Sequence, residues 1–274
     1  MRIKKPSLTK AEVALLLASA ALVGVAAAAP WVHSAADAHA FADQRSFFGI
    51  LYALDVLSNI AFGLAGMAGL FLLWRAPRRA VSNVQRAMSL LFFGGLVLVA
   101  LGSASYHLDP NDATLAGERY CIAVVLAGLL GLAAAGRVSE RAGALLGIGL
   151  LAGGLWSVHA WATGGNLLPW LVLQAGAVVV LWWLAALRRN EDALRIDFVL
   201  VMVAYGAARL LDLNDAAIFE ATGHLVSGHT LKHGVAALAA WPVLTALYAA
   251  GQRRCPAILA PISHEVAIRW WRDA

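Results

Sequence analysis

Charged residues are scarce in this chain: aspartate, glutamate, lysine and arginine make up 14% of its 274 residues. A soluble domain carries about 25%, so the composition argues against an ordinary globular protein in water. Cysteine is nearly absent, and Cys121 and Cys255 lie on different predicted segments, so we expect neither a disulfide nor a cysteine metal site. No basic cluster is interleaved with stacking aromatic residues, so the net charge of +5 does not indicate binding to nucleic acid.

Hydrophobic residues are abundant instead, at 61% of the chain, with a mean hydropathy of +0.73. They are gathered into eight runs, each about long enough to cross a hydrocarbon core of about 30 Å as a helix. Backbone groups in lipid must be paired within each segment, and no alternating barrel pattern is visible. The sequence therefore predicts an all-α integral membrane protein. The eight predicted spans are 11–31, 50–74, 87–106, 119–136, 142–161, 167–187, 196–211 and 228–250.

The first run has a basic start and an alanine-rich end, which are also features of a secretory signal peptide. Because about 20 apolar residues are long for a signal, we expect a retained helix added to a seven-helix bundle. Cleavage is the alternative, and it leaves seven spans with the same site. The predicted organisation is an N-terminal helix and outer loop (1–49), a seven-helix domain (50–251) and a cytoplasmic tail (252–274).

Basic residues indicate the orientation. Seventeen of the 21 lysines and arginines fall at the N-terminus, in alternate connections and in the tail, which all lie on one side of the predicted bundle. The positive-inside rule assigns that side to the cytoplasm. The other connections are rich in aspartate and glutamate. We therefore expect a multi-pass membrane protein with both termini in the cytoplasm.

Five polar residues are predicted to lie at one depth near the outer membrane surface. His107 follows Ser103 by one helical turn at the end of the third run, and His229 and His233 are one turn apart at the start of the last. Glu118 immediately precedes the fourth run. Ionisable residues at membrane depth are costly and usually mark function. The alternative for the His229–His233 pair alone is two interfacial histidines that bond to water or carbonyl groups.

These residue types together point to hydrolysis at a metal. Three histidines leave one position of a tetrahedral zinc ion open for water, and zinc can lower the pKa of that water to about 7. A carboxylate such as Glu118 can accept the water proton and pass it to a leaving amine. A hydroxyl group such as that of Ser103 can donate a hydrogen bond to a developing oxyanion. The predicted reaction is cleavage of an acyl bond.

The same pattern resembles a known family. Ser-x-x-x-His at the end of one helix, an acid eleven residues after that histidine, and His-x-x-x-His on the final helix are similar to the alkaline ceramidases. They also resemble the wider CREST superfamily of seven-helix membrane hydrolases, which includes the adiponectin receptors. The resemblance covers residues 41–248 and implies Zn²⁺ on His107, His229 and His233, with Glu118 acting on the water and Ser103 assisting at the oxyanion. It implies a ceramide-like lipid amide as substrate.

Two features depart from that family. Its acid is usually aspartate, whereas Glu118 is one methylene longer, a displacement that can weaken catalysis if the backbone does not compensate. The acidic N-terminal segment that binds calcium in eukaryotic members has no clear counterpart. Residues 41–45 (Phe-Ala-Asp-Gln-Arg) stand there instead and resemble the bacterial branch, so we expect no calcium. The same resemblance implies a location in a bacterial inner membrane, with the site near the outer face.

Other polar residues leave alternatives open. Asp55 and Asn59, one turn apart in the second run, form either an interhelical hydrogen-bond clamp or support for a zinc-binding histidine. Arg209 could pair with Asp55 or with Asp212. Lys232 lies between the two histidines of the last run but on another helix face, where it reaches outward or meets Asp112. His224 and Ser227 either line the pocket mouth or face water. The histidines expected at the interface or in solvent are His159, His33, His39 and His264.

Two other classes of function compete with the hydrolase. A receptor-like or lipid-binding protein would use the same fold with a structural zinc and little turnover. A transporter with a histidine–carboxylate proton relay would need polar residues continuing toward the cytoplasmic side. Here the polar residues stop in the outer third of the bundle, except for Asp55 and Asn59.

Overall fold

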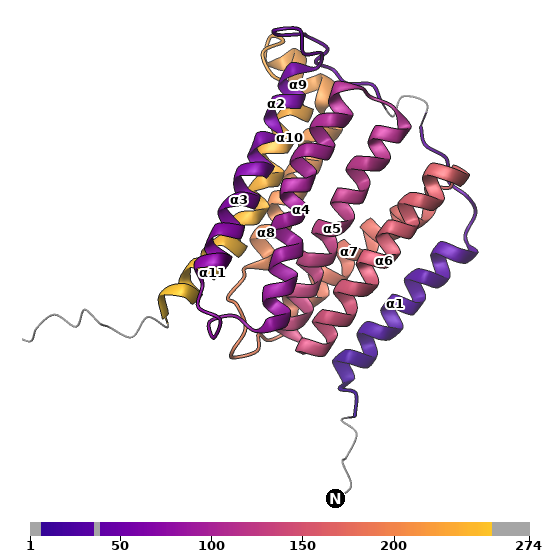
Figure 1. Cartoon of the computed structure of the whole chain (residues 1–274). Coiled ribbons are helices and arrows are strands. Elements are labelled where there is room, and N and C mark those ends of the chain that lie inside the picture. The colour runs from indigo at the N-terminus through magenta and orange to yellow at the C-terminus, as the bar shows by residue number, and fades with distance from the viewer. Residues whose placement is uncertain (1–6, 36–38, 254–274) are drawn as a thin grey trace, which may run out of the picture.

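The structure is a computed structural model that describes residues 7–35 and 39–253. Its helices lie side by side along one common direction, and successive long helices run in opposite directions (Figure 1). The predicted all-α membrane bundle is confirmed. Most of the predicted tail, with Cys255 and His264, lies outside the described residues.

The helices follow the predicted runs closely. They are α1 (Lys10–Ala28), α2 (Ala53–Ser58), α3 (Ile60–Arg75), α4 (Asn83–Leu108), α5 (Asp112–Arg137), α6 (Glu140–Gly164), α7 (Leu168–Ala186), α8 (Phe198–Leu213), α9 (Asp215–Ala221), α10 (Gly228–Ala237) and α11 (Trp241–Arg253), with a 3₁₀ turn η1 (Leu238–Ala240) before the last. Seven segments of the described chain are long and apolar enough to cross a membrane. The predicted run 196–211 forms α8, whose 16 residues span only about 24 Å.

Two predicted spans are interrupted. The second is divided into α2 and α3 at Asn59, whose side chain donates hydrogen bonds to the carbonyl groups of Asp55 and Val56. The last is divided at η1, immediately before Pro242, which has no N–H to donate to the preceding turn. In both cases the two pieces together still make one apolar segment of membrane-spanning length.

Polar caps fix where helices begin at the bundle ends. The Asn111 side chain accepts hydrogen bonds from the first turn of α5, and Ser227 accepts one from the first turn of α10. Such caps satisfy N–H groups that have no partner inside the helix. They place the start of α5 and the start of α10 at the same end of the bundle as the end of α4.

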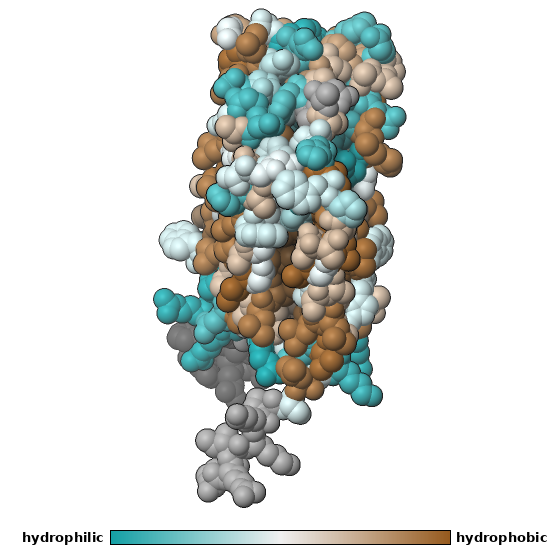
Figure 2. Space-filling view, turned by 90° about the vertical axis from the view of Figure 1, so that its right-hand side faces the viewer, coloured by the Kyte–Doolittle hydropathy of each residue, from teal (hydrophilic) through white to brown (hydrophobic). Residues whose placement is uncertain are grey.

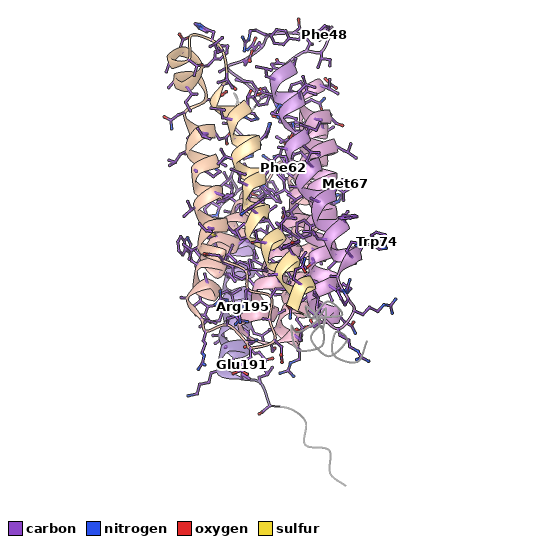
Figure 3. All side chains as sticks on the ribbon, turned by 90° about the vertical axis from the view of Figure 1, so that its left-hand side faces the viewer. Phe48, Phe62, Met67, Trp74, Glu191 and Arg195 are labelled. Carbon is purple, nitrogen blue, oxygen red and sulfur yellow. The ribbon has the colours of Figure 1, made fainter. Side chains whose placement is uncertain are left out.

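The opposite end of the bundle carries the basic connections. Glu191 and Arg195, in the α7–α8 connection, lie at that end, whereas Phe48 lies at the other (Figure 3). Between the ends the surface is largely hydrophobic, with hydrophilic residues gathered above and below (Figure 2). The start of α1 and the end of α11 share the basic end (Figure 1). A chain that begins and ends at the same end of the bundle crosses the membrane an even number of times.

Glycines allow the central helices to approach each other closely. A methyl group added at Gly128 of α5 would lie 2.3 Å from the Phe92 backbone nitrogen of α4. At Gly95 of α4 it would lie 2.9 Å from the Val125 backbone nitrogen of α5. Close backbone approach at small residues is the usual basis of helix packing in lipid. The α4–α5 contact is therefore fixed by glycine, and with it the relative positions of His107 and Glu118.

We expect Gly95→Ala to destabilise the protein by about 1–3 kcal/mol, the usual cost of overpacking a close contact. The neighbouring Gly94 offers a matched control, because a methyl group there meets no atom within 4 Å. Gly94→Ala should leave stability unchanged or slightly raised. Thermal unfolding of the two variants in the same detergent measures the difference, and equal melting temperatures would contradict this account of the α4–α5 contact.

Candidate metal centre

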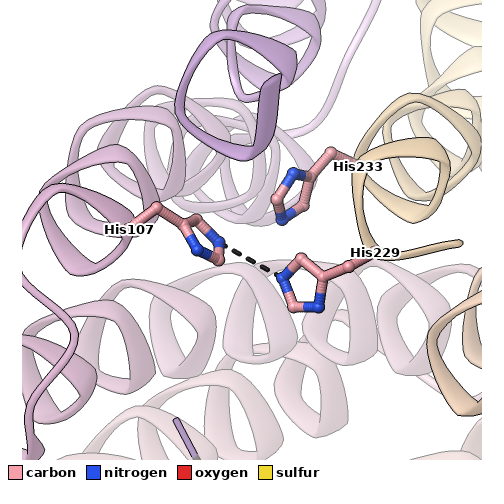
Figure 4. Close-up of side chains that lie close together, drawn as sticks. All are labelled: His107, His229 and His233. Carbon is pink, nitrogen blue, oxygen red and sulfur yellow. Dashed lines mark hydrogen bonds between the residues drawn. The ribbon is translucent and has the colours of Figure 1, made fainter. Parts of the chain in front are cut away.

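Three buried histidine side chains meet at one end of the bundle. The ring centroids of His107, His229 and His233 lie 4.8, 5.1 and 5.2 Å apart in pairs. One nitrogen from each ring lies within 4.8 Å of the others, and all three residues are buried (Figure 4). The predicted convergence of these rings is confirmed.

Two helices deliver the three rings. His107 is in the last turn of α4, and His229 and His233 lie one turn apart near the start of α10. Gly228 lets α10 begin tightly against the α8–α9 corner, because a methyl group there would lie 2.2 Å from the Leu211 carbonyl oxygen. The backbone N–H of His229 donates to the Asp215 carboxylate at 2.7 Å, which fixes this start.

Hydrogen bonds on the outer side of two rings decide where their protons lie. His229 Nδ1 is 3.1 Å from the Asp212 carboxylate, which accepts only. His233 Nδ1 is 2.7 Å from the Ser58 hydroxyl oxygen, and that hydroxyl group itself donates to the Asp55 carbonyl oxygen. Each Nδ1 must therefore carry the proton, which leaves the Nε2 lone pair of each ring free to bind a metal.

The remaining nitrogens fit a bound cation. His229 Nε2 and His107 Nε2 are 3.2 Å apart, close to the separation of about 3.3 Å expected for two nitrogens on one tetrahedral zinc. His233 Nε2 is buried and makes no hydrogen bond with any residue of 7–35 or 39–253. Buried acceptors without donors are rare. Neutral imidazoles converging in this way are a fitting site for a transition metal, and fixing the far nitrogen by a carboxylate is typical of such sites.

Asp212, near the end of α8, is the centre of an ionic network behind His229. Lys232 Nζ lies 2.8 Å from its carboxylate, and Arg209 forms a second ion pair with it. Arg209 thus takes one of its two predicted partners. The prediction that Lys232 turns outward or meets Asp112 is wrong, because α10 packs on α8 and brings Lys232 to Asp212.

Ser103 and Glu118 lie beside each other on α4 and α5. A methyl group at Gly102 would be 3.4 Å from the Glu118 Cα, which shows how closely the helices cross here. Glu118 is near enough to interact with the hydroxyl group of Ser103 and with the charge of Lys232. The Ser103 hydroxyl oxygen is fully buried and makes no hydrogen bond of ordinary geometry with the described residues. The two groups are therefore close enough to contact the same bound molecule.

A short segment before α2 covers two of the three rings. Phe41 packs edge-on against His107 and His229, with centroid distances of 4.8 and 4.7 Å. The Ala42 N–H donates to Asp215, the same carboxylate that holds the start of α10. The sequence predicts only that this segment binds no calcium, and nothing in it predicts a contact with the histidines. An aromatic residue in an outer loop gives no signal of such a contact.

An ion pair between Asp43 and Arg45 stabilises this segment. Its buried carboxylate accepts two hydrogen bonds from the Arg45 guanidinium, at 2.6 and 2.8 Å. These bonds hold the pKa of Asp43 below its ordinary value, although burial opposes the shift. Arg45 also donates to the Leu225 carbonyl oxygen and lies over the Phe219 ring. The segment is thereby joined to the chain between α9 and α10.

Arg119 is a polar residue near the centre that sequence reasoning did not single out. Its guanidinium carbon lies 3.9 Å from the centre of the Trp161 ring, and its buried Nη1 makes no hydrogen bond within the described chain. An arginine in the outer third of a predicted span, away from the basic end, was a usable signal.

The other polar predictions have mixed outcomes. Asp55 is fully buried and accepts a 2.5 Å hydrogen bond from Thr230 of α10, so it clamps two helices and does not pair with Arg209. Its carbonyl group also accepts the hydrogen bond of Ser58, the residue that in turn contacts His233.

His39, predicted in solvent, lies within hydrogen-bond distance of the Tyr106 hydroxyl group and the Asp112 carboxylate. His224 and His159 are exposed, and His224 pairs with Glu220, whereas Ser227 is buried as the cap of α10.

No family model matches the chain, and no curated protein matches it. What defines the molecule is therefore its own architecture: an all-helical membrane bundle with a buried three-histidine site able to hold a metal ion.

We expect the purified protein to contain one transition-metal ion per chain. Alanine at His107, His229 or His233 should each lower the metal content several-fold, because two nitrogens hold an ion less firmly than three. Exposed His159 is the matched control, and His159→Ala should keep the full metal content. Elemental analysis by mass spectrometry after dialysis measures the ratio. Equal metal loss in all four variants would contradict the assignment.

Asp212→Asn should weaken metal binding about 10–100-fold, the usual effect of losing the group that orients a ligating histidine. Glu220→Gln is a matched control, because Glu220 also pairs with a histidine, His224, but at an exposed position. Titration with a chelator of known affinity measures both variants. Wild-type affinity in Asp212→Asn would show that the Asp212–His229 contact has no part in metal binding.

Proposed function

We propose that the protein is a zinc-dependent membrane hydrolase that cleaves an amide bond in a ceramide-like lipid. The observation that carries this proposal is the convergence of three buried imidazoles, two of them with the proton on Nδ1, beside the Glu118 carboxyl group and the Ser103 hydroxyl group. A site of this composition within a membrane bundle suits a reaction on an apolar substrate.

The donor set favours zinc. Three neutral histidine nitrogens in a closed, partly dehydrated site suit a borderline-soft ion, and three protein ligands are typical of catalytic zinc, whose structural sites have four. When bound, zinc supplies a water of lowered pKa and polarises a carbonyl group. His107, His229 and His233 would bind the zinc ion.

Glu118 and Ser103 supply the proton transfers and the polar contact. Glu118 takes a proton from the attacking water at a carboxylate oxygen and passes it to the leaving nitrogen. Ser103 donates its hydroxyl proton in a hydrogen bond to the oxygen that gains negative charge. Lys232 is near enough to interact with the charge of Glu118.

The substrate class follows from depth and from the family resemblance. The three rings lie within the first or last two turns of the apolar segments α4 and α10, where the linkage of a lipid reaches while its chains stay in the bilayer. The order Ser103, His107, Glu118, His229, His233 is similar to that of the alkaline ceramidases, which supports a lipid amide. In a bacterial inner membrane, the site of such a protein would lie near the outer face.

A second function is favoured by one observation. Phe41 lies against two of the three rings and its segment is fastened by Asp215 and by the Asp43–Arg45 pair. A site closed in this way also suits a receptor-like or lipid-binding protein with a structural zinc and little turnover. The two functions differ in whether hydrolysis of a lipid amide depends on Glu118.

We expect release of fatty acid from a ceramide by the zinc-loaded protein in mixed micelles. Glu118→Gln should lower kcat about 10²–10⁴-fold, the usual contribution of a general base, while the zinc content stays at one per chain. Glu118→Asp tests the added methylene and should retain more activity than Glu118→Gln. Chromatography of the released fatty acid measures the rates.

The controls separate the two functions. His159→Ala should hydrolyse at the wild-type rate, and His229→Ala should lose both zinc and activity. A wild-type protein that holds zinc but releases no more fatty acid than Glu118→Gln, across several lipid amides, would overturn the hydrolase and favour the structural zinc.

A further inference from the structure

We propose that the groove between α1 and the α6–α7 face binds one phospholipid of the surrounding bilayer, with a hydrocarbon chain in the groove and its phosphate at Arg141. This inference does not depend on the proposed function, because the groove uses none of the metal-centre residues. It concerns a separate site on the side of the bundle where α1 lies (Figure 1).

The groove has a volume of about 530 Å³ and an almost wholly apolar lining. Leu16 and Val23 of α1 face Leu145 and Trp156 of α6 across it, and α7 closes its floor. A volume of this size is costly to leave empty, and an apolar lining does not retain water. Because α1, α6 and α7 are all of membrane-spanning length, the groove is surrounded by lipid.

The groove exists because α1 packs on α7 but is tied to α6 and to the α6–α7 connection only by polar groups near its two ends. At the basic end the buried Glu12 carboxylate accepts hydrogen bonds from Arg141 and Ser139. At the other end the Val32 N–H donates to Asn166, and the Leu167 N–H donates to the Val32 carbonyl group. These two fastenings hold the helix at a fixed distance from α6.

The middle of the groove is open on the α6 side. Gly149 and Gly153 line it one turn apart, and a methyl group at either position meets no atom within 4 Å. On α7, by contrast, Gly176 is in close contact with Leu22, since a methyl group there would lie 2.5 Å from that side chain. α1 therefore contacts α7 but not the middle of α6. The space that side chains would occupy at Gly149 and Gly153 remains open as a channel.

The Arg141–Glu12 ion pair at the basic end of the groove favours a phospholipid as the occupant. Arg141 lines the groove, its side chain is 42% exposed, and it uses Nε and Nη2 for Glu12. Its Nη1 makes no hydrogen bond with the described residues and is available to an anion. A guanidinium group at the membrane surface suits a lipid phosphate. An apolar channel that ends at such a group matches a chain with a phosphate at its head.

The test is to fill the groove and measure retained lipid. The full chain is purified in mild detergent from membranes and examined by native mass spectrometry, with extraction to identify the lipid. We expect about one phospholipid per wild-type chain, and about tenfold lower occupancy when Gly149→Leu and Gly153→Leu are combined. Gly206→Leu in α8 is the matched control, because a side chain there also enters open space.

The outcomes are distinct. Equal lipid retention in the filled variant and the wild type, or none in the wild type, overturns the proposal. So does a dimer that dissociates when the groove is filled, because a second copy would then be the occupant. Unchanged metal content and melting temperature in the filled variant show that it is folded.

A second measurement uses the wild type alone, in case the filled variant fails to fold. The protein is placed in nanodiscs of phosphatidylcholine with a small fraction of phosphatidylglycerol that carries a photoreactive group on one chain. We expect adducts concentrated in 145–156 of α6 and in the facing part of α1. Adducts spread evenly over the exposed faces of α3 and α8 would contradict a bound lipid.

Discussion

The placement of protons around three buried imidazoles is the constraint on which this structure depends. Asp212 and Ser58 accept the Nδ1 protons of His229 and His233, so the Nε2 lone pairs of both rings point toward the space between the three rings. His233 Nε2 is a buried acceptor without a donor among the described residues, which is costly, and a shared cation removes that cost. The helix caps, the Asp215 bonds and the glycine contact of α4 with α5 all serve to keep the rings there.

The same constraint explains why polar residues gather around the site in a bundle that otherwise has few of them. A carboxylate in an apolar environment needs partners, and Asp212 has Lys232, Arg209 and His229. Asp215 binds two backbone N–H groups, one from α10 and one from the covering segment. The site is thus held by charges that neutralise each other within a few ångströms.

The bundle has two kinds of helix contact. Around the metal centre the helices touch through glycine and alanine, and the backbone positions leave little freedom. α1 instead packs on α7 and is tied to α6 and the α6–α7 connection by polar groups near its two ends, and an apolar groove lies between α1 and α6. A close-packed centre suits positioning of reactive groups, whereas an open groove suits a flexible chain.

The sequence by itself determined the helical class, the positions of the spans, and the shared depth of His107, His229, His233, Glu118 and Ser103. It could do so because the length and polarity of each run fix how far a residue lies along the membrane normal. Only the tertiary structure decided which residues are lateral neighbours. Phe41 covers the rings, Lys232 meets Asp212 and α1 stands off α6, because these contacts depend on how whole helices rotate and pack. No periodicity within a single run contains that information, since the partner face belongs to another part of the chain.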